Sequence, residues 1–220
     1  MKKIAVIPAH NEEQRVATVV QGALKFADKV IVVDDGSTDK TAQAAKDAGA
    51  TTLTHLINLG KGATLKTGTI AAIKLGADII IHLDADGQHD PSEIQSVSTP
   101  VIEGSSDISL GVRATPQYKR MPFVLRLGNS FFKRLSNIFF SVRVDDPLSG
   151  FRVFRKEAYQ HIEWESSGYT VEMEILYRAN RNGLKISEVP IKTVYLDRYK
   201  GTTVFDGFDI LWKMIIWRLS

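Results

Sequence analysis

The stretch Ile79-Ile80-Ile81-His82-Leu83-Asp84-Ala85-Asp86-Gly87-Gln88 decides the fold. Its isoleucine-rich part predicts a buried β-strand, and two aspartates one residue apart follow the end of that strand. Carboxylates this close repel each other unless a cation lies between them. Hard divalent ions such as Mg²⁺ or Mn²⁺ are held by a few carboxylates together with substrate phosphates. The stretch therefore predicts a cation site at a strand end, and the alternative is a surface turn.

Outward from this stretch, the first half of the chain alternates short apolar runs with helical patterns. Runs rich in β-branched residues predict strands at 4–7, 30–33, 51–54, 79–83 and 108–112. The segments between them predict helices at roughly 12–27, 39–48, 61–75 and 91–103. Alternating strands and helices predict an α/β fold with a mostly parallel central sheet and helices on both faces.

Cap residues bound several of these predicted helices. Asn11 and Gln14 resemble a capping box at the start of the first helix. Asp90 stands before a proline, as an N-cap residue does before a proline at the first helical position. Gly49 and Gly76 follow the second and third helices, where glycine closes a helix.

Polar clusters follow three of the predicted strands. Ligands of parallel sheets bind at the carboxyl ends of the strands, so Pro8–Glu12, Asp34–Ser37 and Asp84–Gln88 should share one rim. A fourth segment, Asn58–Gly62, places two glycines and a lysine at a helix start, where a phosphate could bind. Its spacing does not fit a P-loop, which needs four residues between its first glycine and Gly-Lys-Ser/Thr.

Composition limits the classes of protein to which the chain could belong. It has 220 residues, 44% of them hydrophobic and 24% charged, which suits one domain with a substantial core. The absence of cysteine excludes disulfides, thiolate metal sites and a cysteine nucleophile. No uninterrupted apolar run approaches the roughly 20 residues that cross a bilayer.

The middle of the chain is basic and aromatic. No acidic residue occurs from Ile108 to Val144, and phenylalanines and aliphatic residues alternate there with basic ones. Such a segment is typical of a membrane-surface element or of a groove for an anionic ligand, and the alternative is a basic helix packed on the core. The basic residues are Arg113, Lys119, Arg120, Arg126, Lys133, Arg134 and Arg143.

The end of the chain predicts an amphipathic helix. Apolar residues of 205–219 follow helical spacing, with Trp212 and Trp217 next to Lys213 and Arg218. This combination suits a helix lying in the headgroup region of a membrane. Packing against the core or a second subunit are the alternatives.

Five motifs stand in one order: Pro-Ala-His-Asn-Glu from 8, Val-Val-Asp-Asp-Gly-Ser-Thr-Asp from 32, Asn-Leu-Gly-Lys-Gly from 58, Asp-Ala-Asp-Gly-Gln-His from 84 and Asp-Pro-Leu-Ser-Gly-Phe-Arg from 146. This order resembles the family 2 glycosyltransferases of GT-A fold, and most of all the dolichyl- or polyprenyl-phosphate mannose or glucose synthases. The resemblance covers residues 4 to about 197. It implies a GT-A glycosyltransferase domain at 1–200, followed by the amphipathic helix at 201–220.

The resemblance implies roles for the donor-binding residues. Four residues would hold the nucleotide base and ribose, namely Pro8, His10, Glu12 and Asp34, although relatives often carry tyrosine where His10 stands. Lys61 would bind phosphate, and Asp84, Asp86 and Gln88 would hold Mg²⁺ or Mn²⁺ on the sugar-nucleotide diphosphate.

It also implies the groups that act on the reacting atoms. Arg113 and Arg126 would face the diphosphate or the phosphate of the acceptor, and Ser149–Arg152 would form the acceptor side of the pocket. The catalytic residues are then expected to be Asp86, Arg113, Arg126, Asp146 and Arg152.

The implied function is metal-dependent, inverting transfer of a hexose from a GDP-mannose or UDP-glucose type of donor to a polyprenyl or dolichyl phosphate. A phosphate oxygen is already anionic at neutral pH, so this acceptor needs no strong base. With a glycan or small-molecule hydroxyl as acceptor, Asp145 or Asp146 would be the natural base. We expect a peripheral enzyme on the cytoplasmic side of a membrane.

Two other classes of protein fit the sequence less well. A nucleotidyltransferase would usually show a Gly-x-Gly-Thr-Arg turn after its first strand, and Pro8–Glu12 is not such a turn. A non-catalytic basic module for membrane or nucleic acid leaves the strand-end carboxylates unexplained, and these would repel nucleic acid phosphates. We therefore expect no nucleic acid partner.

Single residues outside the motifs have simpler expected roles. His82 lies inside a strand and is expected to be a core histidine. Glu172 and Glu174 lie on different faces of a predicted helix. The resemblance directs Glu172 toward the pocket, and we expect Glu174 to be solvated.

Overall fold

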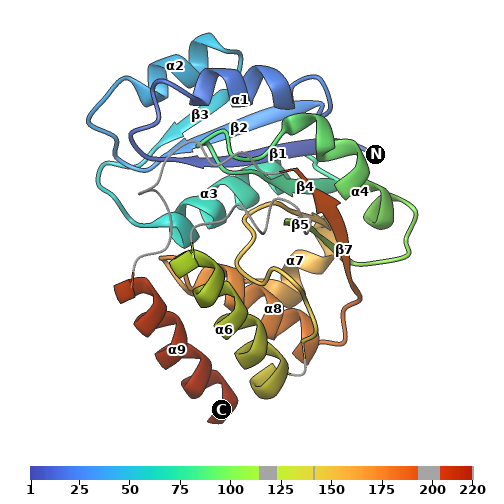
Figure 1. Ribbon diagram of the computed structural model, residues 1–220. Coiled ribbons are helices and arrows are strands. Elements are labelled where there is room, and N and C mark those ends of the chain that lie inside the picture. The colour runs from blue at the N-terminus through green and yellow to red at the C-terminus, as the bar shows by residue number, and fades with distance from the viewer. Residues whose placement is uncertain (114–122, 141, 193–203, 220) are drawn as a thin grey trace.

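The computed structural model describes residues 1–113, 123–140, 142–192 and 204–219, with side chains at all of these except 123–127, 129 and 204–206. Within these residues a seven-stranded sheet lies between two layers of helices (Figure 1). The strands are β1 Lys3–Ala9, β2 Lys29–Asp34, β3 Thr51–Thr54, β4 Ile79–His82, β5 Ile108–Arg113, β6 Arg152–Arg155 and β7 Ile186–Ile191. The five predicted strands are confirmed.

The helices alternate with the strands in the first half and cluster in the second. The predicted helices are present with shorter bounds, and the fourth begins as the 3₁₀ turn η1. The bounds are α1 Val16–Ala23, α2 Thr41–Asp47, α3 Lys61–Lys74, η1 Pro91–Glu93, α4 Ile94–Ile102, α6 Phe123–Phe140, α7 Lys156–Ile162, α8 Val171–Arg181 and α9 Val204–Leu219. None of these helices, over the residues described, is both long and apolar enough to cross a membrane.

The sheet is mostly parallel, as predicted. Its strand order is β3-β2-β1-β4-β6-β5-β7. β1 pairs in parallel with β2 and β4, and β2 with β3, whereas β6 runs antiparallel between β4 and β5. β7 pairs in parallel with β5 at the other edge. The registers place Ala9 beside Asp34 and His82 beside Arg152.

Both faces of the sheet are covered because its strands are apolar along their length. In β1, Ile4 and Val6 join the core beneath α3 and α6–α9, while Ala5 and Ile7 join the core beneath α1, α2 and α4. Gly68 lets α3 come close to β1, since a Cβ there would lie 2.3 Å from Val6 Cγ1. The predicted α/β fold with helices on both faces is confirmed.

One predicted cap is wrong and the others are confirmed. Asn11 has a positive φ of 53°, and its amide oxygen accepts the Thr38 N–H, so it caps no helix. The helix begins later, at α1. Asp90 caps η1 by accepting the Ser92 N–H. Gly49 and Gly76 close α2 and α3 with positive φ, as predicted.

The carboxyl ends of the parallel strands β1–β4 lie on one edge of the sheet. In Figure 1, β1 runs from the N-terminus at the right toward the left, so this edge faces left. The segments after β1, β2 and β4 are those that carry the predicted polar clusters. The fold therefore gathers these clusters on one rim.

Candidate active site

A lysine and two carboxylates meet beyond the end of β4. Lys61 is the first residue of α3, and its Nζ lies 2.8 Å from Asp84 Oδ1 and 2.9 Å from Glu172 Oε1. Burial opposes the charged lysine, but the charges of Asp84 and Glu172 outweigh this effect and raise the pKa of Lys61. Burial likewise opposes charge on Asp84, yet Lys61 holds its pKa below the ordinary value. The three groups thus form a partly buried, charged cluster.

Asp86 stands beside this cluster and is harder to ionise. Its Oδ1 accepts the Gln88 N–H at 2.9 Å. Burial and then the charge of Asp84 raise the pKa of Asp86 to about 6, and the charge of Glu12 adds to the effect. The two aspartates of this stretch therefore lie close enough to repel, as the sequence predicts.

The oxygen atoms of this stretch could hold a divalent cation. No group of three or more histidines, aspartates or glutamates among the described residues is placed to hold a metal. The predicted set is instead two carboxylates and one amide, from Asp84, Asp86 and Gln88, and supplies the hard oxygen donors that Mg²⁺ and Mn²⁺ take. Burial and the charge of Asp84 raise the pKa of Asp86, so a cation bound here would favour its charged form. The residues fit such an ion.

The start of α3 is fixed by the loop at 164–168. The Ala63 N–H donates to Ser167 O at 3.0 Å, and Trp164 Nε1 donates to Gly62 O at 2.8 Å. A Cβ on Gly62 would lie 2.1 Å from Ser166 O, so the backbones meet only because this residue is glycine. The contacts hold Lys61 at the rim.

Glu174 holds that same loop, and the prediction that it is solvated is wrong. It is almost fully buried in α8. Its carboxylate accepts the N–H groups of Glu165 and Ser166, each at 2.9 Å, and pairs with Arg178 Nε at 2.7 Å. The helical pattern placed Glu174 away from Glu172 but gave no sign of the loop that covers it.

Asp35 fixes the backbone directly before Lys61. This role was not expected from the sequence. Its carboxylate accepts the Leu59 N–H at 2.9 Å and the Gly60 N–H at 2.8 Å, and it lies 2.8 Å from His55 Nδ1. The one available signal was the Asp-Asp pair at the end of β2, in which only Asp34 was singled out.

The loop before β6 forms another wall of the cluster. A Cβ on Gly150 would lie 2.3 Å from Asp84 Oδ2, so the missing side chain makes room for this carboxylate. Arg152, predicted to be catalytic, is buried, and burial lowers its pKa to about 10. Its guanidinium donates to the carbonyl oxygens of Ser149, Pro147 and Glu172 at 2.9, 2.9 and 2.7 Å. It therefore ties this loop to α8.

The two aspartates before Pro147 have different surroundings. Asp146 is buried, and its Oδ2 lies 3.1 Å from Arg113 Nε. Asp145 is exposed and pairs with Lys133. The structure thus joins Arg113 to Asp146 and leaves Asp145 at the surface. Arg126 belongs to α6, but its side chain lies outside the described residues, as do Lys119 and Arg120.

The predicted nucleotide-binding residues lie at the ends of β1 and β2. Pro8 pairs with β2 one residue before the Ala9–Asp34 pair. Asp34 is buried and its Oδ1 accepts the Ser37 N–H at 3.2 Å. Glu12 is buried with its carboxylate 3.3 Å from Arg15, and His10 lies exposed with Nδ1 3.0 Å from the Asp35 carbonyl oxygen. The structure therefore brings these four residues to one edge.

Two histidines near the cluster are neutral. His82 lies in β4 with Nε2 2.9 Å from Thr69 Oγ1, and burial lowers its pKa to about 3. The expected core histidine is confirmed. Burial also lowers the pKa of His89 to about 4, and its ring packs against Phe151. The positive charge among these described residues thus comes from lysine and arginine.

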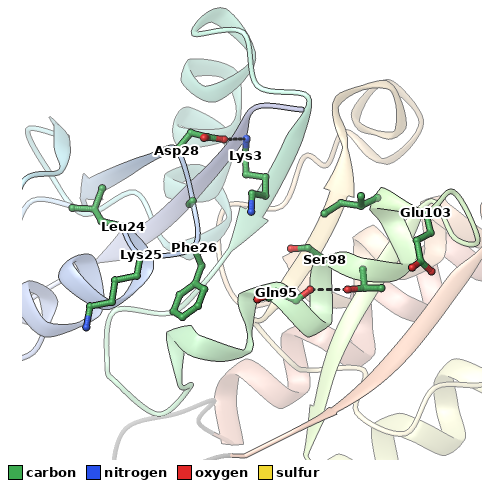
Figure 2. A pocket seen from close by; sticks show the side chains of 11 residues that line it. Lys3, Leu24, Lys25, Phe26, Asp28, Gln95, Ser98 and Glu103 are labelled. Atoms are coloured by element: carbon green, nitrogen blue, oxygen red, sulfur yellow. Dashed lines mark hydrogen bonds between the residues drawn. The ribbon is translucent and has the colours of Figure 1, made fainter.

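A cavity of about 590 Å³ lies elsewhere, at the amino ends of β1 and β2 (Figure 2). Lys3, Phe26 and Ser98 line it together with residues of α4. None of the predicted site residues takes part in it. The cavity is therefore separate from the charged cluster.

Residues 4–163 match the family model described as glycosyl transferase family 2. The chain belongs to this family. It is a glycosyltransferase, as the sequence predicts, and the charged cluster lies at its sheet edge.

Curated relatives cover nearly the whole glycosyltransferase. It is 32% identical to the UDP-N-acetylglucosamine–dolichyl-phosphate N-acetylglucosaminyltransferase of Methanococcus voltae, over 98% of this chain and 95% of the relative. It is 25% identical to the polyprenol monophosphomannose synthase of Mycolicibacterium smegmatis, over 98% of this chain and 86% of the relative. These relatives are named as sugar transferases for polyprenyl-type phosphates.

Solved structures of glycosyltransferases share the fold. Glucosyl-3-phosphoglycerate synthase from Mycobacterium tuberculosis, crystallised with Mn²⁺, UDP-glucose and phosphoglyceric acid, matches with a TM-score of 0.81 and 20% identity. The match covers 99% of this chain and 79% of that chain. The predicted GT-A fold is confirmed.

Proposed function

We propose that this glycosyltransferase moves a hexose from a nucleotide sugar to a polyprenyl phosphate, inverting the anomeric centre and yielding a lipid-linked monosaccharide. The observation that carries the proposal is the partly buried Lys61–Asp84–Glu172 cluster at the carboxyl edge of the sheet. Relatives named as transferases for dolichyl and polyprenol phosphates support the acceptor class.

The donor would lie along the rim, with its base at the ends of β1 and β2. Asp34 and Glu12 offer buried carboxylate oxygens for base or ribose donors, and Pro8 and His10 flank them. The diphosphate would lie toward Lys61, which the loops of Asp35 and Trp164 hold in place. A fixed cation beside the departing diphosphate stabilises the negative charge that develops there.

A divalent ion would be held by Asp84, Asp86 and Gln88. When bound, Mg²⁺ or Mn²⁺ would supply positive charge to the diphosphate leaving group. The residues of the chain would orient the donor through the nucleotide, and Glu172 would keep Lys61 charged when Asp84 turns to the ion.

The acceptor phosphate would meet Arg113, with Asp146 holding the guanidinium from behind at 3.1 Å. This ion pair suits a positioning role for Asp146 more than proton transfer. A phosphate acceptor needs no such transfer, because it is anionic at neutral pH. Arg152 would position the loop at 147–150 through its three carbonyl contacts.

A membrane surface would bring the acceptor to this site, with the enzyme as a peripheral partner of the bilayer. α9 packs Ile210 and Met214 on the core, whereas Phe208, Trp212 and Ile216 are exposed four residues apart. This exposed row, which we call the α9 stripe, has the spacing and the tryptophan of an interfacial helix. Basic residues of α6 and α9 would meet anionic headgroups.

Calorimetric titration with GDP and UDP, each with and without Mn²⁺, tests the donor site first. We expect one nucleotide to bind, with affinity at least tenfold weaker without metal and in Asp86→Asn. Transfer to a short polyprenyl phosphate is then measured with the matching GDP- or UDP-sugars. Binding of neither nucleotide would overturn the proposal, and transfer to a glycan hydroxyl alone would overturn its acceptor.

A further inference from the structure

The loop between β3 and α3 presents aliphatic side chains to solvent. Leu56 is 100% exposed, Ile57 66% and Leu59 45%, and we call these three residues the aliphatic tip. Isolated exposed leucines are common on proteins, but adjacent exposed aliphatic residues indicate a contact surface.

The aliphatic tip is held in this outward position. Asp35 accepts the N–H groups of Leu59 and Gly60, and the ring of His55 lies between Asp35 and Thr67. Gly36 lets the turn after β2 approach the tip closely, since a Cβ there would lie 2.7 Å from the carbonyl carbon of Ile57. The fold thus uses a buried carboxylate to fix apolar side chains in water.

The aliphatic tip also lies next to the candidate active site in the chain. It follows β3 at the carboxyl edge, at the left in Figure 1, and Lys61 comes two residues after Leu59. The Asp35 contacts that fix the tip are those that lead into Lys61. A surface bound by the tip would therefore stand at the rim where the substrates meet.

The small size of the tip favours a lipid surface over a second protein chain, and the net charge of +3 with the acid-free basic segment 108–144 favours an anionic one. Three aliphatic side chains fall far short of the roughly 800 Å² per partner that a stable protein interface buries.

We propose that the aliphatic tip inserts into the headgroup region of an anionic bilayer and holds the active-site rim against it. The inference rests on the proposed function, because a polyprenyl phosphate presents its phosphate at headgroup depth. It adds to the α9 stripe a second contact, on a different element, fixed directly to the start of α3.

The cysteine-free chain allows a direct test with one labelled position. Leu56→Cys carrying an NBD fluorophore is mixed with phosphatidylcholine–phosphatidylglycerol vesicles that lack polyprenyl phosphate. We expect a blue shift and at least a twofold rise in emission. The matched control is Leu75→Cys, 40% exposed at the amino edge of the sheet, and its emission should not change. No change at position 56, or equal changes at both positions, overturns the proposal.

Kinetics separate this proposal from the proposed function. In Leu56→Asp/Ile57→Asp, we expect the KM for a long polyprenyl phosphate in vesicles to rise at least tenfold. The rate of transfer to a short, water-soluble polyprenyl phosphate should stay within twofold of wild type. In the control Leu75→Asp, both activities should stay within twofold of wild type.

Unchanged kinetics with vesicles would overturn the role of the tip. Failure of wild type with the short acceptor would count against the proposed function alone, since the NBD signal needs no transfer. An NBD change on raising protein concentration without vesicles would indicate a second copy and overturn the bilayer assignment.

Discussion

At residue scale, the site depends on space left for charged groups as much as on the groups themselves. Asp84 has Lys61 on one side and the backbone of Gly150 on the other, where any Cβ would lie 2.3 Å from its Oδ2. Real Cβ atoms do not approach an oxygen this closely, so a side chain at 150 must move either the loop or the carboxylate. The position of Asp84 is therefore set by a glycine that carries no chemistry.

We expect Gly150→Ala to lower kcat/KM roughly 10²-fold, because a misplacement of about 1 Å near the reacting groups has an effect of that size. Nucleotide affinity with Mn²⁺ should fall as well, measured by calorimetry. Gly128→Ala in α6 is the matched control, since a Cβ there meets nothing within 4 Å. Equal activity in the two variants would show that Asp84 needs no such space.

At element scale, α8 supports the site from behind. Glu174 takes the N–H groups of Glu165 and Ser166, and the following residues contact the start of α3. Arg178, one turn along α8, lies 2.7 Å from the same carboxylate. Burial opposes the charge of Glu174, but the hydrogen bonds from Ser166 and Glu165 and the charge of Arg178 outweigh it and lower its pKa below 4.5.

We expect Glu174→Gln to reduce the free energy of unfolding at pH 7 by roughly 1–3 kcal/mol, the usual effect of disrupting buried hydrogen bonds to a charged group. Because the pKa is lower in the folded state, this contribution is fully present above about pH 5 and is lost as pH falls through the folded pKa. Urea unfolding of both proteins at pH 7 and at acidic pH measures it. If the difference in unfolding free energy between wild type and Glu174→Gln did not shrink at acidic pH, the role of the charge would be contradicted.

The elements predicted best are those whose signal is local. The strands β1, β2 and β4 are continuous apolar runs, and their ends carry the motifs, so the rim followed from the sequence. The short β6 and the edge strand β7, which contains Pro190, lack that signal and were not predicted. The roles of Asp35 and Glu174 were missed because their partners come from loops that only the tertiary fold brings near.

At the scale of the whole molecule, the helical layer of α6, α8 and α9 exposes large apolar side chains to solvent. The layer of α6, α8 and α9 buries aromatic residues, with the Trp217 ring stacked on Tyr177 at 5.6 Å, yet α9 keeps Trp212 62% exposed. A helix that packs one partly buried tryptophan against the core and exposes another has two apolar faces. The inner face docks on the core, and the α9 stripe needs a second apolar environment, which the proposed lipid acceptor would supply.

We expect Phe208→Glu/Trp212→Glu to weaken binding to phosphatidylcholine–phosphatidylglycerol vesicles at least tenfold, because charges on this face would have to enter the apolar region of the bilayer. Co-sedimentation measures the binding, and wild-type binding should fall with added salt, since basic residues attract the anionic lipid. Ile102→Glu, at a 38% exposed site on α4, is the matched control and should bind as wild type does.

The α9 variant could instead bind vesicles fully, while sedimentation shows a dimeric wild type and a monomeric variant. The stripe would then be a contact between copies of this chain. The aliphatic tip would then have to hold the enzyme to the membrane alone.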